Sequence, residues 1–162
     1  MAEMNQIEKI NFDSDLQSLI AGLIGKPCCR QRIGRMRSLS IGFGNKIAHG
    51  KARLIDDFYG EWGIGTYLSA WRVVHEDVIL CGSQDVVESL SELDERLGRI
   101  EIGRIQEINF VSKFHIQAYC DNGIYIDFLA ASSDDDEMFH IFCPEGVCIE
   151  YSVLGGWGVS RR

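Results

Sequence analysis

Apolar residues recur at helical spacing in two short parts of the chain. The first predicted helix begins at Asp13 or Ser14, either of which can cap it, and ends before Gly25. The second begins near Asp85, which has capping-box spacing to Glu88. Each helix has a single apolar stripe, so each is expected to lie against a sheet. The stripes are Leu16, Leu19, Ile20, Leu23 and Ile24 in the first helix, and Val86, Val87, Leu90, Leu93 and Leu97 in the second.

Most of the remaining chain alternates apolar and polar residues with the period of a β-strand. The clearest case is a hairpin whose strands, 114–120 and 124–128, are joined by a turn that contains Asn122-Gly123. Asn-Gly between two alternating segments is a strong hairpin signal, because both turn positions favour positive φ. A second hairpin is expected over 138–143 and 147–153. Further strands are expected over 37–43, 65–74, 77–81 and 100–110.

The two parts of the chain follow a similar order of elements. Segment 39–45 matches 116–122, and the hairpin within 71–80 matches the one within 139–149. The first copy carries about nine extra residues within 45–62. This order suggests an old duplication of two halves, 13–84 and 85–162, although alternating strands can produce such a match by chance.

Composition favours one packed domain over residues 1–162. A chain of this length can bury about 68–70% of the surface of its unfolded state. Hydrophobic residues make up 46% of the sequence, and there are only two prolines. The expected fold is α+β: mostly antiparallel β-sheet with two short helices and two pseudo-repeated α-β halves. Residues 1–11 are expected to be weakly ordered.

No secretion signal or membrane segment is predicted. Glu3, Gln6 and Glu8 interrupt any signal-peptide pattern, and no apolar run approaches the ~20 residues that span a bilayer. The six cysteines include several in apolar strand-like segments, where cysteine acts as a small hydrophobic residue. The adjacent pair Cys28-Cys29 does not form a metal motif, because neighbouring side chains in extended chain point apart. We expect a cytoplasmic location, reduced thiols and no membrane partner.

Charge is divided unevenly along the chain, which has a net charge of −8. Residues 54–162 hold 20 acids and 7 bases, whereas residues 26–53 hold eight bases and no acid. The acidic surplus peaks at Asp134-Asp135-Asp136-Glu137, between two expected strands. Such a run is usually a solvated loop, but a basic partner would relieve its repulsion and speed association. Calcium is less supported, since the run lacks the alternate spacing of an EF-hand loop.

The basic segment 26–53 has a nucleic-acid interpretation, because Lys and Arg neutralise phosphates. Phe43 is the only aromatic residue there, so platforms for base stacking are scarce. The negative net charge would also repel a polyanion at long range. We therefore expect these bases to pair with the protein's own acids, and we expect no nucleic-acid partner.

Two groups of residues suggest other chemistry. His140, Cys143 and Cys148 loosely match a zinc knuckle across the second hairpin, but no second ligand pair completes the site. His49 with Asp56-Asp57 could form an acid–base cluster on the inserted segment. The chain has no nucleophile elbow, HExxH motif or P-loop. We expect no catalytic residue, metal or cofactor, and the alternative is a metal-dependent or hydrolytic enzyme.

Aromatic residues are concentrated near the same insertion. Core packing explains Trp71 and one of Tyr67 or Trp62. Trp62 at the edge of the insertion could instead anchor an interface, because Trp and Tyr dominate binding hot spots. The predicted partner-binding residues are Asp134, Asp135, Asp136 and Glu137, together with Asp56, Asp57, Tyr59, Glu61 and Trp62.

Four segments resemble a recurring pattern in small bacterial proteins. They are Tyr59-Gly60-Glu61-Trp62, Ala70-Trp71-Arg72, Cys81-Gly82-Ser83-Gln84-Asp85 and the hairpin segment 139–146. Several of those proteins look like immunity proteins of polymorphic-toxin or contact-dependent growth inhibition systems. The resemblance covers roughly residues 16–154, and its motifs are structural, so no functional residue is carried over by position.

The resemblance implies a protein that binds and neutralises a cognate toxin C-terminal domain of the nuclease class in the cytoplasm. Its acidic surface would cover the basic active site or substrate surface of that toxin, without a cofactor or a catalytic residue. The enzyme described above remains an alternative, as does a structural or regulatory module that associates with itself.

Overall fold

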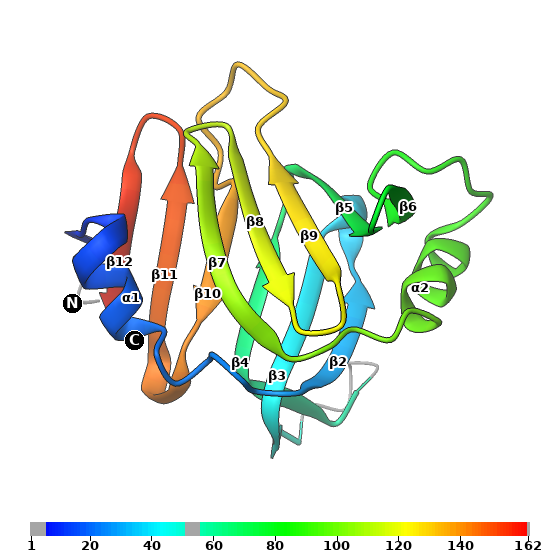
Figure 1. Cartoon of the computed structure of the whole chain (residues 1–162), viewed down its shortest axis with the longest axis horizontal. Helices are drawn as coiled ribbons and strands as arrows, with labels where there is room; N and C mark the ends of the chain where they lie inside the picture. Colours follow the sequence, from blue (N-terminus) through cyan, green and yellow to red (C-terminus); the bar gives the residue numbers. More distant parts are fainter. Residues whose placement is uncertain (1–5, 51–55, 162) are drawn as a thin grey trace.

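Two antiparallel β-sheets and two short helices form the protein, as the sequence predicts (Figure 1). The computed structural model describes residues 6–50 and 56–161. The larger sheet has the strand order β1-β12-β11-β10-β4-β3-β2. Its strands are β1 (Glu8–Lys9), β2 (Cys28–Ile33), β3 (Leu39–Ala48), β4 (Phe58–Thr66), β10 (Phe139–Phe142), β11 (Val147–Ser152) and β12 (Gly156–Arg161).

The smaller sheet has the order β6-β5-β9-β8-β7, and all its neighbours are antiparallel. Its strands are β5 (Ala70–His75), β6 (Val78–Gly82), β7 (Ile105–Ser112), β8 (His115–Cys120) and β9 (Ile124–Leu129). The Asn122-Gly123 turn joins β8 to β9 as predicted, and Gly123 has a φ of 82°. Large buried side chains from both sheets, Phe43 and Phe128 among them, belong to one core.

Strand order in the two sheets follows one rule. Strands β2, β3, β4, β5 and β6 of the first half correspond to β7, β8, β9, β10 and β11 of the second. Replacing each strand by its counterpart converts the order β11-β10-β4-β3-β2 of the larger sheet into the order β6-β5-β9-β8-β7 of the smaller one. Each half therefore gives a three-stranded meander to one sheet and a two-stranded hairpin to the other. The segments matched in the sequence, 39–45 with 116–122 and 71–80 with 139–149, occupy equivalent places. Strands β1 and β12 have no counterpart among the described residues.

The helices close opposite sides of the space between the sheets (Figure 1). A π-helical turn, Phe12–Leu16, leads into α1 (Gln17–Leu19), and Phe12 packs on Phe110 of β7 and Trp157 of β12. On the other side, α2 (Leu90–Gly98) lies between the edge strands β2 and β6. Leu16, Ile20 and Leu23 of the first stripe and Leu93 and Leu97 of the second face the core, as expected. Ile24, Val86 and Leu90 are 41%, 94% and 42% exposed, so neither predicted stripe is buried along its whole length.

Both predicted helix starts are wrong. Asn11 caps the first helix, since its Oδ1 accepts hydrogen bonds from the backbone N–H groups of Ser14 and Asp15. Ser89 caps α2, because its Oγ accepts from the Glu92 N–H, and Ser89 and Glu92 have the capping-box spacing that Asp85 and Glu88 were expected to use. Asp85 pairs instead with Arg96, and the segment before α2 is irregular.

Several strand boundaries also differ from the expectation. The strand expected over 65–74 is two strands, the end of β4 and the start of β5, separated by a turn at 67–69. Strand β2 was not predicted, because Cys28–Ile33 reads Cys-Cys-Arg-Gln-Arg-Ile and shows no apolar alternation. The strand expected over 100–110 starts later, at Ile105.

Candidate functional site

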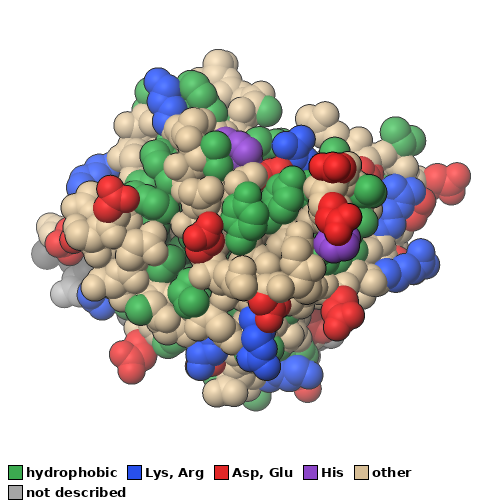
Figure 2. All heavy atoms as spheres, viewed as in Figure 1, with side chains coloured by type: hydrophobic (Ala, Val, Ile, Leu, Met, Phe, Trp, Pro, Cys, Tyr) green, Lys and Arg blue, Asp and Glu red, His purple; other side chains and the backbone are tan. Residues whose placement is uncertain are grey.

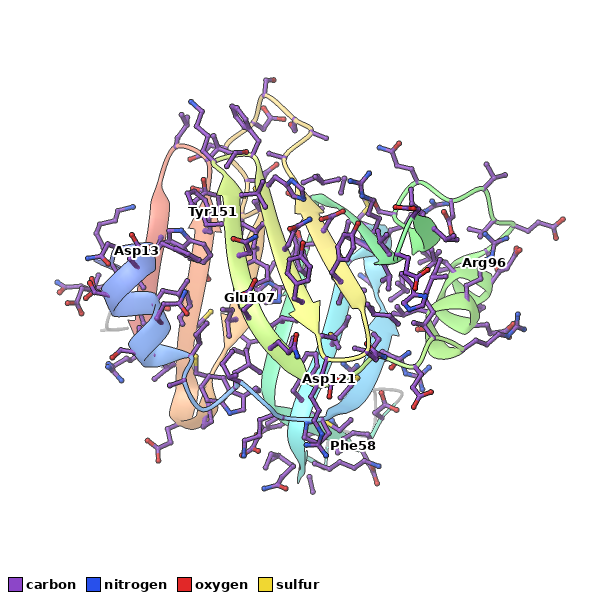
Figure 3. The ribbon with its side chains drawn as sticks, viewed as in Figure 1. Asp13, Phe58, Arg96, Glu107, Asp121 and Tyr151 are labelled. Atoms are coloured by element: carbon purple, nitrogen blue, oxygen red, sulfur yellow. The ribbon has the colours of Figure 1, made fainter. Side chains whose placement is uncertain are left out.

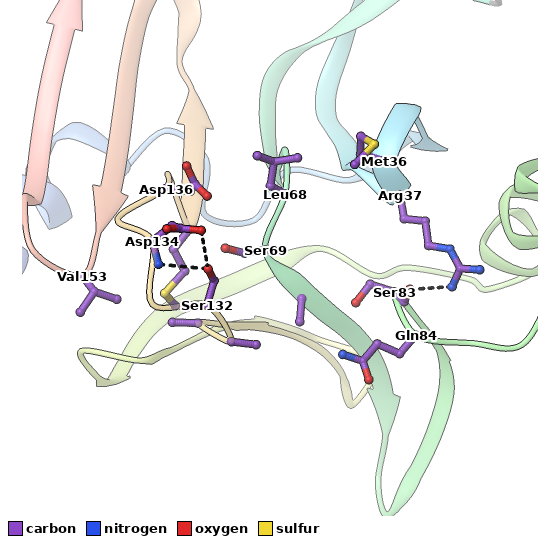
Figure 4. Close-up of a pocket in the computed structure, with 14 residues that line it drawn as sticks. Met36, Arg37, Leu68, Ser69, Ser83, Gln84, Ser132, Asp134, Asp136 and Val153 are labelled. Atoms are coloured by element: carbon purple, nitrogen blue, oxygen red, sulfur yellow. Dashed lines mark hydrogen bonds between the residues drawn. The ribbon is translucent and has the colours of Figure 1, made fainter.

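The acidic run lies on the loop between β9 and β10, residues 130–138, called the acidic loop below. With the β4–β5 turn and residues 36–37, this loop surrounds an open pocket of about 300 Å³ (Figure 4). The pocket receives the carboxylates of Asp134 and Asp136 from one side and Leu68 and Ser69 from another. Loops from three parts of the chain therefore meet at one end of the two sheets.

The four acids of the loop have different environments. Asp134 and Asp136 are exposed, and Asp134 exchanges hydrogen bonds with Ser132. Asp135 fixes the loop to the β11–β12 turn, because its Oδ1 accepts from the Leu154 N–H at 2.9 Å. The loop therefore has a defined shape, and Asp134 and Asp136 are its two acids that line the pocket.

Glu137 turns inward instead of facing the pocket. Its Oε1 lies 2.8 Å from Nδ1 of His140, a residue that is only 3% exposed. Tyr67 and Phe142 pack on the His140 ring, at 4.7 Å and 4.4 Å between ring centroids. Glu137, predicted as a partner-binding residue, thus helps to hold the base of the acidic loop.

Arg37 is the cation that lines the same pocket. Its Nη1 donates to the carbonyl oxygen of Ser83 at 2.7 Å (Figure 4). It also donates to the carbonyl oxygen of Asp85 at 2.8 Å. Its own carbonyl accepts from Nε1 of Trp71. Within the described part of the chain, no Lys, Arg or His lies within ion-pair distance of Asp134, Asp135 or Asp136. No ion pair with a described cation therefore neutralises the charge of these three acids.

The second predicted segment, residues 56–62, lies at the opposite end of β4. Phe58 begins this strand far from the acidic loop (Figure 3). Asp56 accepts from Nε of Arg30 at 2.8 Å and from Nε of Arg32 at 3.1 Å. The hydrogen bond from Arg32 is the main reason that the pKa of Asp56 lies below its ordinary value. The two predicted acidic segments do not form one surface.

Three other residues of this segment have structural contacts. Glu61 pairs with Lys26 at 3.3 Å and accepts from the Asn45 N–H, and that backbone hydrogen bond is the main cause of its lowered pKa. Trp62 is 7% exposed and belongs to the core, so little of its ring is available to a partner. Tyr59 is half-exposed and stacks on His49, and Asp57 is exposed.

Internal pairing accounts for much of the basic segment 26–53. Lys26, Arg30 and Arg32 all form ion pairs with the protein's own acids, and Arg32 also contacts Asp94 at 2.7 Å. The prediction of internal pairing is confirmed for these three residues. Lys51 and Arg53 lie outside the described residues.

The predicted zinc group does not assemble, and the acid–base group is together only in part, because the backbone N–H of His49 donates to the Asp57 carbonyl oxygen at 3.2 Å. Among residues 6–50 and 56–161, no three His, Cys, Asp or Glu side chains are placed to hold a metal ion. His140 bonds to Glu137, and burial raises the pKa of the Cys143 thiol to about 11, so this thiol is protonated at neutral pH. In the other group, Asp56 is engaged by two arginines. No disulfide joins any two of the six cysteines.

A buried carboxylate that the sequence did not reveal lies on the outer face of the smaller sheet, which Figure 2 views. Asp127 is fully buried and accepts from Nε of Arg72 at 2.6 Å and from Nε2 of Gln117 at 2.9 Å, and it lies 2.6 Å from Nε2 of His115. Burial alone would raise its pKa, but these hydrogen bonds lower it below the ordinary value. The group joins side chains from β5, β8 and β9, so it could have been predicted only from knowledge of which strands pair.

Comparisons with known proteins leave the site to be interpreted from its own geometry. No family model, no curated protein and no solved structure matches the chain. None of the helices in the described residues is long and apolar enough to cross a membrane.

Proposed function

We propose that this protein is an immunity protein that binds and neutralises a basic toxin domain in the cytoplasm. The acidic loop is the centre of the contact, and its carboxylates face the basic surface with which a nuclease toxin holds nucleic acid. Neutralisation then requires only that the toxin's active site or substrate surface be covered. The resemblance of segments 59–62, 70–72, 81–85 and 139–146 to such proteins motivates this proposal.

One observation distinguishes Asp134 and Asp136 from the predicted acids Asp56 and Glu61. Asp134 and Asp136 are exposed beside an open pocket and have no cationic partner among the described residues, whereas Asp56 and Glu61 are each paired with Lys or Arg. Two unpaired carboxylates on an anchored loop attract a basic protein at long range and lose little conformational freedom on contact.

The experiment measures toxin association with charge-reversed variants. The partner tested is a toxin domain encoded beside this protein's gene, and the readouts are survival of cells that express it and the association rate of the purified pair. Asp134→Lys with Asp136→Lys should abolish most protection and slow association at low salt by about tenfold or more. The wild-type rate should fall steeply as salt rises.

Asp57→Lys is the matched control for the single variant Asp134→Lys, because each reverses one exposed acid and changes the net charge by +2, and Asp57 lies near the opposite end of β4. It should leave association close to wild type. Equal loss from both variants would show that only net charge matters, and full protection by the Asp134 and Asp136 variant would overturn the proposed site.

A further inference from the structure

Sheet edges in this fold are mostly covered, which prevents pairing with other chains. At the outer edge of β2, the Ile33 N–H donates to Oδ1 of Asp94 from α2. At β7, Ile105 exchanges backbone hydrogen bonds with Gly25 and Lys26. At the far edge of the larger sheet, β12 is paired with the two-residue strand β1.

Strand β6 lacks such a cover, although a bulge at Leu80 interrupts its pairing with β5. Beyond Ile105, β7 is likewise bonded only to β8 among the described residues, but Val111 is its one exposed aliphatic side chain there. Strand β6 forms an edge of the smaller sheet, and Val78, Ile79 and Leu80 are 59%, 56% and 39% exposed. Apart from its pairing with β5, none of the described residues hydrogen-bonds the backbone of Val78 to Cys81. An exposed aliphatic edge strand with free backbone groups is a template for another strand.

The equivalence of the two halves shows what belongs beside β6. Its counterpart is β11, and β12 pairs with β11 along its whole length, from Val147 opposite Arg161 to Ser152 opposite Gly156. After β6, by contrast, the chain turns away through residues 83–89 to α2, and no described strand pairs with β6 on its outer side. The smaller sheet therefore lacks the strand that completes the larger one.

We infer that β6 of a second copy of this chain fills that place, joining two smaller sheets into one sheet of ten strands. An antiparallel β6–β6 contact is isologous, so a single two-fold axis satisfies both free edges. With Ile79 opposite its own copy, Asp77 faces Cys81 and Glu76 faces Gly82. The acids that flank the strand then face neutral residues, and like charges are not placed directly opposite each other.

Side chains on the outer face of the smaller sheet also favour the β6–β6 dimer. Strand register places Ile79 beside Val74, which is followed across the sheet by Tyr125 and Tyr119. The two tyrosine rings lie 5.3 Å apart. In the dimer this apolar row continues from one copy into the other through the paired Ile79 side chains. Such cross-strand aliphatic and aromatic neighbours are the unit of sheet stabilisation.

Sedimentation of the purified protein over a wide concentration range tests the inference. The wild type should pass from monomer to dimer, and Ile79→Lys should weaken the dimer by about tenfold or more, because lysine on an edge strand opposes pairing. Val111→Lys is the matched control, since Val111 is 50% exposed on β7, the opposite edge strand of the same sheet. Circular dichroism should show both variants folded.

Hydrogen exchange locates the contact independently of any variant. Amides of Val78 to Gly82 should exchange more slowly as protein concentration rises, whereas amides near Val111 should not change. A monomer at every concentration, or a dimer unaffected by Ile79→Lys, would overturn the inference. Neither result bears on the acidic loop, which belongs to another part of the fold.

Discussion

The acidic residues of segments 56–61 and 134–137 look alike in sequence but have different roles in the fold. Asp56 and Glu61 each meet Lys or Arg side chains from the basic segment 26–53. Asp134 and Asp136 meet none among the described residues, although Asp135 and Glu137 beside them anchor the loop by hydrogen bonds. The first segment uses its charge to join strands, and the second leaves charge available to a partner.

This difference shows that a run of acids has no fixed role. A carboxylate placed near an arginine from an adjacent strand becomes structural, and its pKa falls. A carboxylate on a loop that leaves the sheet keeps its charge exposed to solvent. Removing acids one at a time should therefore separate stability from binding.

The largest loss of stability is expected from Asp127→Asn. Asp127 is fully buried, and its two oxygens accept from Arg72 and Gln117 and contact His115. An amide cannot accept at both positions, so at least one donor would lose its partner. The free energy of unfolding should fall by about 1–3 kcal/mol, measured by urea denaturation. An unchanged value would show that the group is not needed for stability.

The pH dependence of the same variant sharpens this result. Because the pKa of Asp127 is lowered in the folded state, its contribution is present above the ordinary carboxyl pKa of about 4 and is lost as pH falls through the folded value. Acidification should therefore cost the wild type more stability than it costs Asp127→Asn. Parallel stability curves for the two proteins would contradict the lowered pKa.

A smaller loss is expected from Asp56→Asn. This change weakens hydrogen bonds from Arg30 and Arg32, which are only partly buried and can be solvated in the variant. The free energy of unfolding should fall by about 1 kcal/mol. Toxin association should remain close to wild type, and a large loss of association would return this segment to the candidate site.

The fold class could be predicted from local patterns, because Asn122-Gly123 and the apolar stripes of the helices act over short distances. Strand β2 could not be predicted in this way, since its residues lack apolar alternation and it is held by β3 and by Asp94 of α2. The start of α2 was misplaced because Asp85 has a cap's chemistry but engages Arg96 in the folded chain. These errors arise where long-range contacts overrule local preference.

The candidate site shows the same limit. The acidic loop was predicted from composition alone, because a run of four adjacent acids can be read directly from the sequence. The sequence left open whether Trp62 or Tyr67 is buried, and it predicted internal pairing of the basic segment without naming Asp56, since both depend on which strands lie side by side. The polar group around Asp127 joins three strands, and no spacing along the chain indicates it.

The smallest change in stability is expected when Asp134 and Asp136 are both replaced by Asn. Neither side chain pairs with a cation of the described chain, so the free energy of unfolding should stay within about 0.5 kcal/mol of wild type. Relief of repulsion within the loop acts in the stabilising direction. Association with the toxin should nevertheless slow, and the dependence of its rate on salt should become shallower, because two carboxylates that attract the partner are gone. A loss of stability matching that of Asp56→Asn, with association unchanged, would mean that both acidic segments are structural.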